Sequence, residues 1–279
     1  EEVRSALNDK VASEVIMDRY GIDEKGNFEG SNVLTVSASL GEIASEHGLE
    51  KEEVRKIIED SREELLSVRV DRTRPFRDEK IIASWNGLLI SALSKWGPLI
   101  GGEYLDRAGR ALNFLRENLW DPDEGVLYRR YKDGDVSVPG FLEDYAYLAR
   151  GAFDHYQISE DVFSLKFAGS LLSSLVEKFH DRDSGMIYFS ARGSSEGTLR
   201  TQDLDDRSAP SSVSVALDLM MNLDLLFPEA DFAGLAERSL ARYGGRIESD
   251  PLRHASLSMS RARMSRGSLE FTILADEIP

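Results

Sequence analysis

The sequence predicts a mainly α-helical (α/α) toroid, in which repeated helical hairpins form a ring, and three observations support this prediction. Helical patterns dominate the chain, strand patterns are few and short, and one turn-plus-strand segment occurs twice. A repeat that holds two helices and a short strand is typical of a repeated helical hairpin. The pattern alone leaves open whether the hairpins form a closed ring or an open stack.

The helices are predicted from apolar residues that recur with the spacing of one helix face. In the first helical segment these residues lie at positions 3, 7, 11, 15 and 16. The pattern predicts helices at Val3–Tyr20, Leu49–Val70, Ile81–Leu99, Tyr104–Leu119, Leu142–Tyr156, Val162–Phe179, Val213–Leu226, Phe232–Tyr243 and, less regularly, 251–264. Short runs of β-branched and aromatic residues predict strands at Val126–Tyr131, Met186–Ser190 and Leu269–Leu274.

The repeated segment reads NLWDPDEGVLYRR at 118–130 and KFHDRDSGMIYFS at 178–190. The copies align without gaps, so that Asp121 and Gly125 match Asp181 and Gly185. Asp initiates such turns, and Gly supplies a positive φ. The Asp-x-Asp-x-Gly spacing also resembles part of a calcium loop, but the downstream Glu of that loop is missing from both copies. We therefore expect structural turns and favour them over calcium sites.

Composition and charge restrict the classes of partner. The formal net charge of −16 and the pI near 4.8 argue against nucleic acid, because an acidic surface repels phosphates. No apolar run approaches the roughly 18 residues of a membrane span. The chain has no Cys, and its four His form no close pair. We therefore expect a cytoplasmic protein that binds neither nucleic acid nor membrane and holds no metal and no cofactor.

Three segments place carboxylates at the predicted start of an inner helix, and they are the candidate catalytic segments. They read RDEKIIASWNGLL (77–89), FLEDYAYLA (141–149) and DLDDRSAPSSVSVAL (203–217). The helix dipole stabilises carboxylates at such positions, which is a sufficient reason for most of them. If the helix starts converge on one funnel, two of the acids are suited to general acid and base chemistry on a sugar. The candidate catalytic residues are Asp78, Asp144 and Asp206.

Trp85-Asn86-Gly87 is the most unusual sequence within a predicted helix, because Asn and Gly are poor helix formers. Gly permits close approach of a ligand or another backbone, and Asn offers a donor and an acceptor. We predict that Trp85 faces the funnel as an aromatic platform, with a tight contact between helices as the alternative. The other candidate substrate-binding residues are Lys80, Asn86, Glu143, Tyr145 and Ser211, for which core packing, helix capping or surface ion pairs are the alternatives.

The stretch RPFRDEKIIASWNGLLISALSKWG (74–97) resembles the Arg-x-x-Pro-x-x-Asp-x-Lys-x-x-x-x-Trp-Asn-Gly-Leu pattern of a thioredoxin-domain-containing family. This family includes the spermatogenesis-associated thioredoxin-like proteins. GNFEGSNVL (26–34) and FLEDYAYLA (141–149) are similar to further blocks of it, in the same order. The resemblance implies a thioredoxin-like domain followed by an (α/α)6 toroid similar to six-hairpin glycosidases and N-acylglucosamine 2-epimerases. It also implies that this chain forms an incomplete (α/α)6 barrel. We therefore expect residues 1–279 to form a single toroid domain, a fragment without its thioredoxin-like domain.

Two departures from the family affect the expected function. Ser212 and Val213 replace the Gly and Asn of the family's Pro-Ser-Gly-Asn-Ser block, and no His lies in the three candidate helix starts. No epimerase mechanism is therefore carried over. The expected function is a carbohydrate-active domain with glycosidase-like or isomerase-like acid/base chemistry on a sugar or small molecule. The alternative, slightly favoured by Ser212 and Val213, is a non-catalytic binding or scaffold domain that serves a thioredoxin-like domain.

Overall fold

The computed structural model describes residues 1–194 and 200–267. Its contacts divide the chain into two compact units, Glu1–Asp78 and Glu79–Pro279. The single toroid domain expected over 1–279 therefore stays a prediction, and each unit is described by itself. Among the described residues, no helix is both long and apolar enough to cross a membrane.

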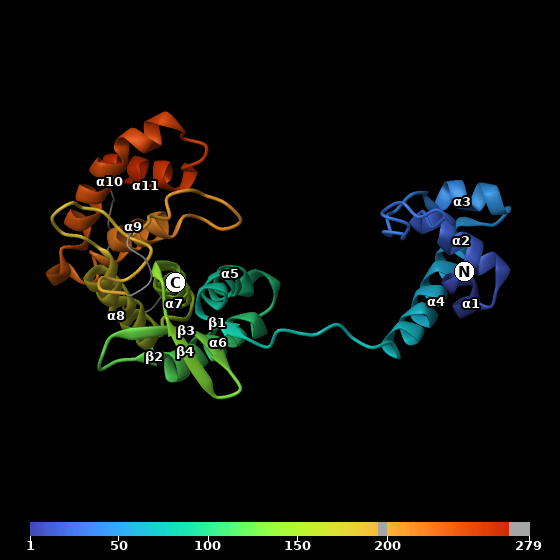
Figure 1. Cartoon of the computed structure of the whole chain (residues 1–279), viewed down its shortest axis with the longest axis horizontal. Coiled ribbons are helices and arrows are strands. Elements are labelled where there is room, and N and C mark those ends of the chain that lie inside the picture. Colours follow the sequence, from blue (N-terminus) through green and yellow to red (C-terminus); the bar gives the residue numbers. More distant parts are fainter. Residues whose placement is uncertain (195–199, 268–279) are drawn as a thin grey trace, which may run out of the picture. The chain divides into compact units, whose positions relative to one another are not determined.

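The first unit consists of four helices (Figure 1): α1 (Glu2–Leu7), α2 (Lys10–Tyr20), α3 (Leu40–His47) and α4 (Lys51–Val70). Their small core is made of Leu7, Val15, Ile16, Ile43, Ala44, Val54 and Ile58. The sequence predicts one helix over Val3–Tyr20, and this is wrong at Asn8. Asn8 has a φ of 45° and ends α1, and Asp9 begins α2 by accepting a hydrogen bond from the Ala12 N–H at 2.8 Å.

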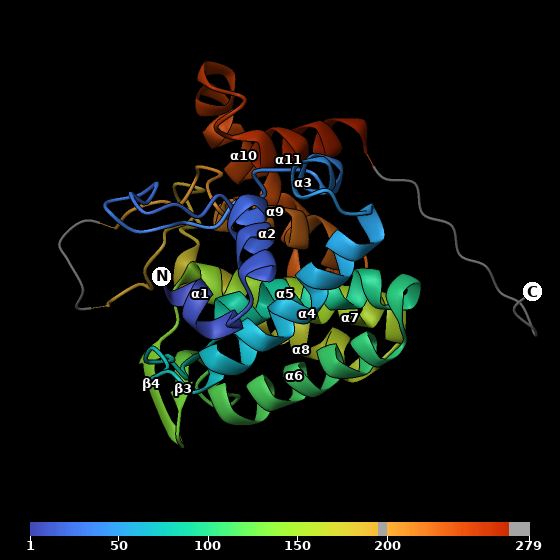
Figure 2. The ribbon, with the colours of Figure 1, turned by 90° about the vertical axis from the view of Figure 1, so that its right-hand side faces the viewer.

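The second unit is an arc of helical hairpins. Its helices are α5 (Ala83–Ile100), α6 (Glu103–Leu119), α7 (Leu142–Ser159), α8 (Val162–Phe179), α9 (Ser212–Leu223), α10 (Phe232–Ser249) and α11 (Ala255–Arg266), with a 3₁₀ turn at Pro228–Ala230. Figure 2 shows α5, α6, α7 and α8 running alongside one another. The inner helices α5, α7, α9 and α11 contact one another in sequence, and α6, α8 and α10 cover them from outside. This confirms the mainly α (α/α) toroid architecture.

Four short strands lie at the start of the arc: β1 (Ile81–Ile82), β2 (Trp120–Asp121), β3 (Val126–Lys132) and β4 (Asp135–Pro139). The other three pair antiparallel with β3. The predicted strand Val126–Tyr131 is confirmed. The predicted strand Met186–Ser190 is wrong, because that segment makes only one isolated bridge, between His180 and Ile187, within the described residues. The predicted strand Leu269–Leu274 lies outside the described residues.

The two repeated turns have the same hydrogen bonds. Asp121 Oδ1 accepts from the N–H groups two and three residues later at 3.0 and 3.2 Å, and Asp181 Oδ1 does the same at 3.0 and 3.3 Å. Gly125 and Gly185 have φ values of 58° and 71°. Both aspartates thus serve as turn residues, as predicted.

A buried tyrosine binds the backbone of the segment that follows each turn. The Tyr145 hydroxyl accepts from the Leu127 N–H at 2.7 Å, and the Tyr243 hydroxyl accepts from the Ile187 N–H at 2.8 Å. Burial raises the pKa of each tyrosine to about 12. Tyr145, a candidate for sugar binding, is 1% exposed and anchors β3. Its predicted binding role stays a prediction.

Candidate functional site

Gly87 explains the Trp-Asn-Gly sequence, because it lets α5 and α7 approach with their backbones in contact. A Cβ atom at Gly87 would lie 2.4 Å from the Tyr147 carbonyl carbon, and one at Gly151 would lie 2.7 Å from the Gly87 oxygen. Asn86 Nδ2 donates to the Ile82 carbonyl at 2.9 Å, so its amide secures the first turn of α5. The tight contact between helices is thus present. Trp85 is 69% exposed.

Asp144 joins three elements at the start of α7. Its Oδ1 accepts from the Ser84 N–H at 3.1 Å, and its Oδ2 accepts from the Phe141 N–H at 2.9 Å and from Arg129 Nη1 at 2.8 Å. Burial lowers the pKa of Arg129, but the charges and hydrogen bonds of Asp144 and Glu143 outweigh burial and raise it above its ordinary value. Because Asp144 is fully buried and both of its oxygens are engaged, the geometry supports an architectural role.

Asp206 and Ser211 hold the loop that leads into α9. Asp206 Oδ1 accepts from the Ser211 N–H at 2.9 Å, and Asp206 Oδ2 accepts from the Ser256 N–H at 2.7 Å. The Ser211 hydroxyl caps α9 by accepting from the Ser214 N–H at 3.1 Å. These bonds tie the start of α9 to the start of α11. The catalytic role predicted for Asp206 and the binding role predicted for Ser211 stay predictions.

Asp78 and Lys80 lie in an exposed irregular stretch before β1. The prediction that Asp78 stands at a helix start is wrong, since α5 begins at Ala83. The pairing of β1 with β3 keeps residues 81 and 82 extended and delays the helix. Asp78 is also the last residue of the first unit, whereas Asp144 and Asp206 belong to the second.

The starts of α7 and α9 converge on a cavity of about 520 Å³. It is lined by Glu143, Tyr147, Phe189, Thr201, Gln202, Asp203, Asp205, Arg207, Ser208, Ala209 and Pro210. Glu143 lies in the first turn of α7, Tyr147 lies one turn further on, and the remaining residues come from the segment before α9. The Tyr147 hydroxyl donates to the Pro210 carbonyl at 2.6 Å, which links the two sides. The predicted convergence of helix starts therefore holds for two of the three segments.

Three carboxylates line this cavity, and each already has a hydrogen-bonding neighbour. Glu143 Oε1 accepts from Arg129 at 2.7 Å. Asp203 Oδ2 accepts from the backbone N–H and the hydroxyl of Ser212 at 2.9 and 2.7 Å. Asp205 Oδ2 accepts from Arg253 Nε at 3.0 Å. These neighbours fix the carboxylates in place and leave other lone pairs for a ligand.

Of the predicted site residues, only Glu143 lines this cavity, and the sequence reasoning missed Asp203 and Asp205 in favour of Asp206. The alternation Asp203-Leu204-Asp205 in the sequence indicates which aspartates face the cavity. Leu204 is 5% exposed and anchors the segment in the core. In an extended segment the residues on either side of an inward-facing Leu point to the opposite face. That pattern favours Asp203 and Asp205 over Asp206 as cavity residues.

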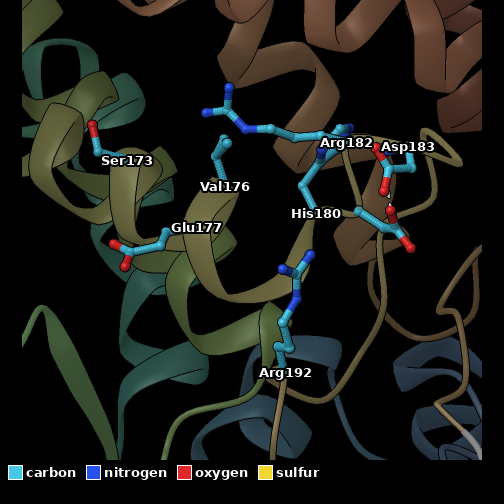
Figure 3. A pocket seen from close by; sticks show the side chains of 8 residues that line it. Ser173, Val176, Glu177, His180, Arg182, Asp183 and Arg192 are labelled. Atoms are coloured by element: carbon cyan, nitrogen blue, oxygen red, sulfur yellow. Dashed lines mark hydrogen bonds between the residues drawn. The ribbon is translucent and has the colours of Figure 1, made fainter.

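A second cavity of about 610 Å³ lies at the C-terminal end of the outer helix α8, and its lining side chains are drawn in Figure 3. Arg182 and Arg192 line it together with the acidic residues Glu177, Asp181 and Asp183. His180 also lines it, and its Nδ1 is buried with no hydrogen-bond partner in the described part of the chain. Opposite charges are mixed at this cavity, and it lies away from the inner helix starts.

Two buried histidines predict how stability depends on pH. Burial lowers the pKa of His155. Burial also lowers the pKa of His180, and the nearby positive charges of Arg182 and Arg238 lower it further. Because both pKa values are lower in the folded state, the unfolded chain binds more protons as the pH falls below the ordinary histidine pKa of about 6.5. We expect full stability above that pH and a loss as the pH falls through it. Urea unfolding of H155N/H180N between about pH 5 and 8 should give a flatter profile than the parent chain; an unchanged profile contradicts the assignment.

Among the described residues, no group of three or more His, Cys, Asp or Glu side chains is arranged to hold a metal ion.

Comparison with solved structures returns carbohydrate-active toroids at low identity. Cellobiose 2-epimerase from Bacillus thermoamylovorans aligns with a TM-score of 0.49 and 14% identity, covering 61% of this chain and 46% of that one. A D-mannose isomerase aligns with a TM-score of 0.47 and 12% identity, covering 87% and 69%. At these identities the similarity says nothing about the residues of the site.

No family model matches the chain, but sequence comparison with curated proteins finds clear relatives. Human spermatogenesis-associated protein 20 is 32% identical over 243 residues, which are 80% of this chain and 31% of that protein. The rat protein of the same name is 30% identical over 272 residues, which are 90% of this chain and 34% of that protein. The chain is therefore a homologue of these spermatogenesis-associated proteins and spans about a third of their length.

Proposed function

We propose that the second unit binds a sugar, or a similar small polyhydroxylated molecule, in the cavity at the starts of α7 and α9. The observation that carries this proposal is the set of three carboxylates that line one cavity of about 520 Å³. Carboxylates are acceptors only, and the hydroxyl groups of a sugar are donors that match them. Gln202 and Arg207 add hydrogen-bond donors to the lining of the same cavity.

Aromatic rings complete the match between the cavity and a sugar. Tyr147 and Phe189 both line it, and Phe189 stacks on Phe141 with ring centroids 5.1 Å apart and planes inclined by 9°. Burial and the charges of Asp203 and Glu143 raise the pKa of Tyr147, so its hydroxyl stays protonated and keeps its bond to Pro210. A flat, fixed ring suits the C–H face of a sugar, as proposed from the sequence for Trp85.

Binding is better supported than catalysis. Acid/base cleavage of a glycoside uses two carboxylates that flank the reacting bond, and the cavity offers three candidates. Each of them, however, already accepts a hydrogen bond from a neighbouring residue. Glycosidase-like or isomerase-like chemistry by Glu143, Asp203 or Asp205 is therefore a further step that depends on binding being shown first.

The proposal predicts that neutral sugars raise the melting temperature of the full chain. A sugar at 100 times its Kd stabilises the folded state by about 2.7 kcal/mol. E143Q should lose this response, because an amide replaces the acceptor carboxylate while the hydrogen bond from Arg129 can persist. E117Q, which alters an exposed glutamate of α6 outside the cavity, is the matched control and should keep the response. Melting curves with glucose, mannose and cellobiose test this; no shift with any sugar, or equal shifts in both variants, contradicts the proposal.

One observation favours a second function, that of a non-catalytic interaction domain. Trp85, Leu89, Trp96 and Leu99 are 69, 53, 60 and 74% exposed, and their spacing places them along one face of α5. Large exposed apolar patches commonly mark contacts with another folded domain. The thioredoxin-like domain expected from the sequence is the partner that this alternative requires. The melting temperature of such a domain would rise when that partner is added and would remain unchanged when sugars are added.

A further inference from the structure

We infer that the ligand of this site is an anionic sugar, one that carries a phosphate or carboxylate group; this inference rests on the proposed function. A smaller cavity of about 430 Å³, called the second chamber below, adjoins the 520 Å³ cavity at the starts of α7 and α9, which is called the first cavity. The two share Thr201, Gln202, Asp203, Asp205 and Arg207 as lining residues. A molecule that enters one chamber therefore meets the side chains that open into the other.

The second chamber has a different charge from the first. Three arginines line it: Arg200 and Arg207 from the segment before α9, and Arg246 from α10. Its carboxylates are Asp203 and Asp205, whereas the first cavity has Glu143 in addition and only Arg207 as a cation. The second chamber thus has more arginines than carboxylates, although the net charge of the chain is −16.

The two carboxylates of the second chamber offset only part of the charge of its three arginines. Asp205 forms ion pairs with Arg207 at 3.8 Å and, more closely, with Arg253 at 3.0 Å, which does not line the chamber. Arg200 directs its Nε and Nη2 groups to the Ser190 carbonyl, at 3.2 and 2.8 Å, and lies over the Tyr188 ring at 4.2 Å. These partners of Arg200 are uncharged, so positive charge remains for a ligand.

The two chambers together match the two ends of one molecule. Guanidinium groups bind phosphate and carboxylate through paired hydrogen bonds, more specifically than a point charge does. The carboxylates and rings of the first cavity match hydroxyl groups and an apolar sugar face. A sugar with an anionic substituent satisfies both sets, and the separation of charges fixes its direction in the site.

Calorimetric titration of the full chain with glucose, glucuronate and glucose 6-phosphate tests this inference. At least one anionic sugar should bind more tightly than glucose, and sodium chloride should weaken its binding more than that of glucose. R246Q should weaken the anionic sugar about tenfold or more, as expected for the loss of a hydrogen bond to a charged group, and leave glucose unchanged. Arg246 is exposed on α10, so its replacement should not unfold the chain. R110Q, at an exposed position of α6, is the matched control and should change neither ligand.

The outcomes separate this inference from the proposed function. If glucose binds as tightly as both anionic sugars, or R246Q behaves as R110Q does, the anionic ligand is wrong and sugar binding stands. If inorganic phosphate binds as tightly as glucose 6-phosphate, the sugar makes no contribution, and the inference fails as well. If none of the sugars binds, the proposed function falls together with the inference. Tighter binding of either anionic sugar than of glucose and phosphate supports it and identifies the preferred anion.

Discussion

Gly87→Ala is expected to destabilise the second unit by about 3 kcal/mol, at the upper end of the usual cost of overpacking. The added Cβ atom would lie 2.4 to 2.6 Å from backbone atoms of Tyr147 and Leu148. Backbone atoms of a packed helix cannot rotate aside as a side chain can, so α5 and α7 would have to separate along their contact. Urea unfolding followed by circular dichroism measures the change in the free energy of unfolding.

Gly245→Ala is the matched control for this prediction. Gly245 also lies inside a helix, α10, but a Cβ atom there would meet no other atom within 4 Å. Alanine should therefore stabilise that helix by about 1 kcal/mol through its higher helix propensity. Opposite signs for the two variants indicate that close helix contact requires Gly87. A stabilising Gly87→Ala would mean that α5 and α7 do not lie this close.

Asp144→Ala is expected to cost about 3–5 kcal/mol, the usual loss when one partner of a buried ion pair is removed. The variant takes away the acceptor for the Ser84 and Phe141 N–H groups and one of the two carboxylates bound by Arg129. Asp123→Ala, in the exposed turn after β2, should change stability by only about 0.5 kcal/mol or less. Unfolding in urea compares the two variants directly.

A double-mutant cycle with Arg129→Ala distinguishes the buried pair from a general effect of the substitution. Because Asp144 and Arg129 contact each other at 2.8 Å, the cost of the double variant should be clearly smaller than the sum of the two single costs. Additive costs would show that the pair contributes nothing as a pair. A stable Asp144→Ala that loses sugar binding would instead restore the catalytic or binding role predicted from the sequence.

Local sequence patterns predict those elements whose formation depends on residues close together in the chain. Val162–Phe179 was predicted with the bounds of α8, and Asp121 and Asp181 were predicted as turn residues, because helix periodicity and turn chemistry depend on near neighbours. The break at Asn8 was missed, because the apolar spacing continues across it and Asn adopts the left-handed conformation easily. The short strand β4 was missed because its pairing with β3 arises after the hairpin closes.

The sequence by itself determined that this protein is a mainly α chain of repeated hairpins, and that carboxylates gather near the starts of inner helices. Only the tertiary structure decided which of those carboxylates line a cavity. Asp144 and Asp206 are engaged by donors from Ser84 and Ser256, which lie 60 and 50 residues away along the chain. Asp203 and Asp205 were brought beside Glu143 by the packing of α9 against α7. Hydrogen-bond partners this distant leave no local pattern, so the choice between architecture and binding site is fixed by packing.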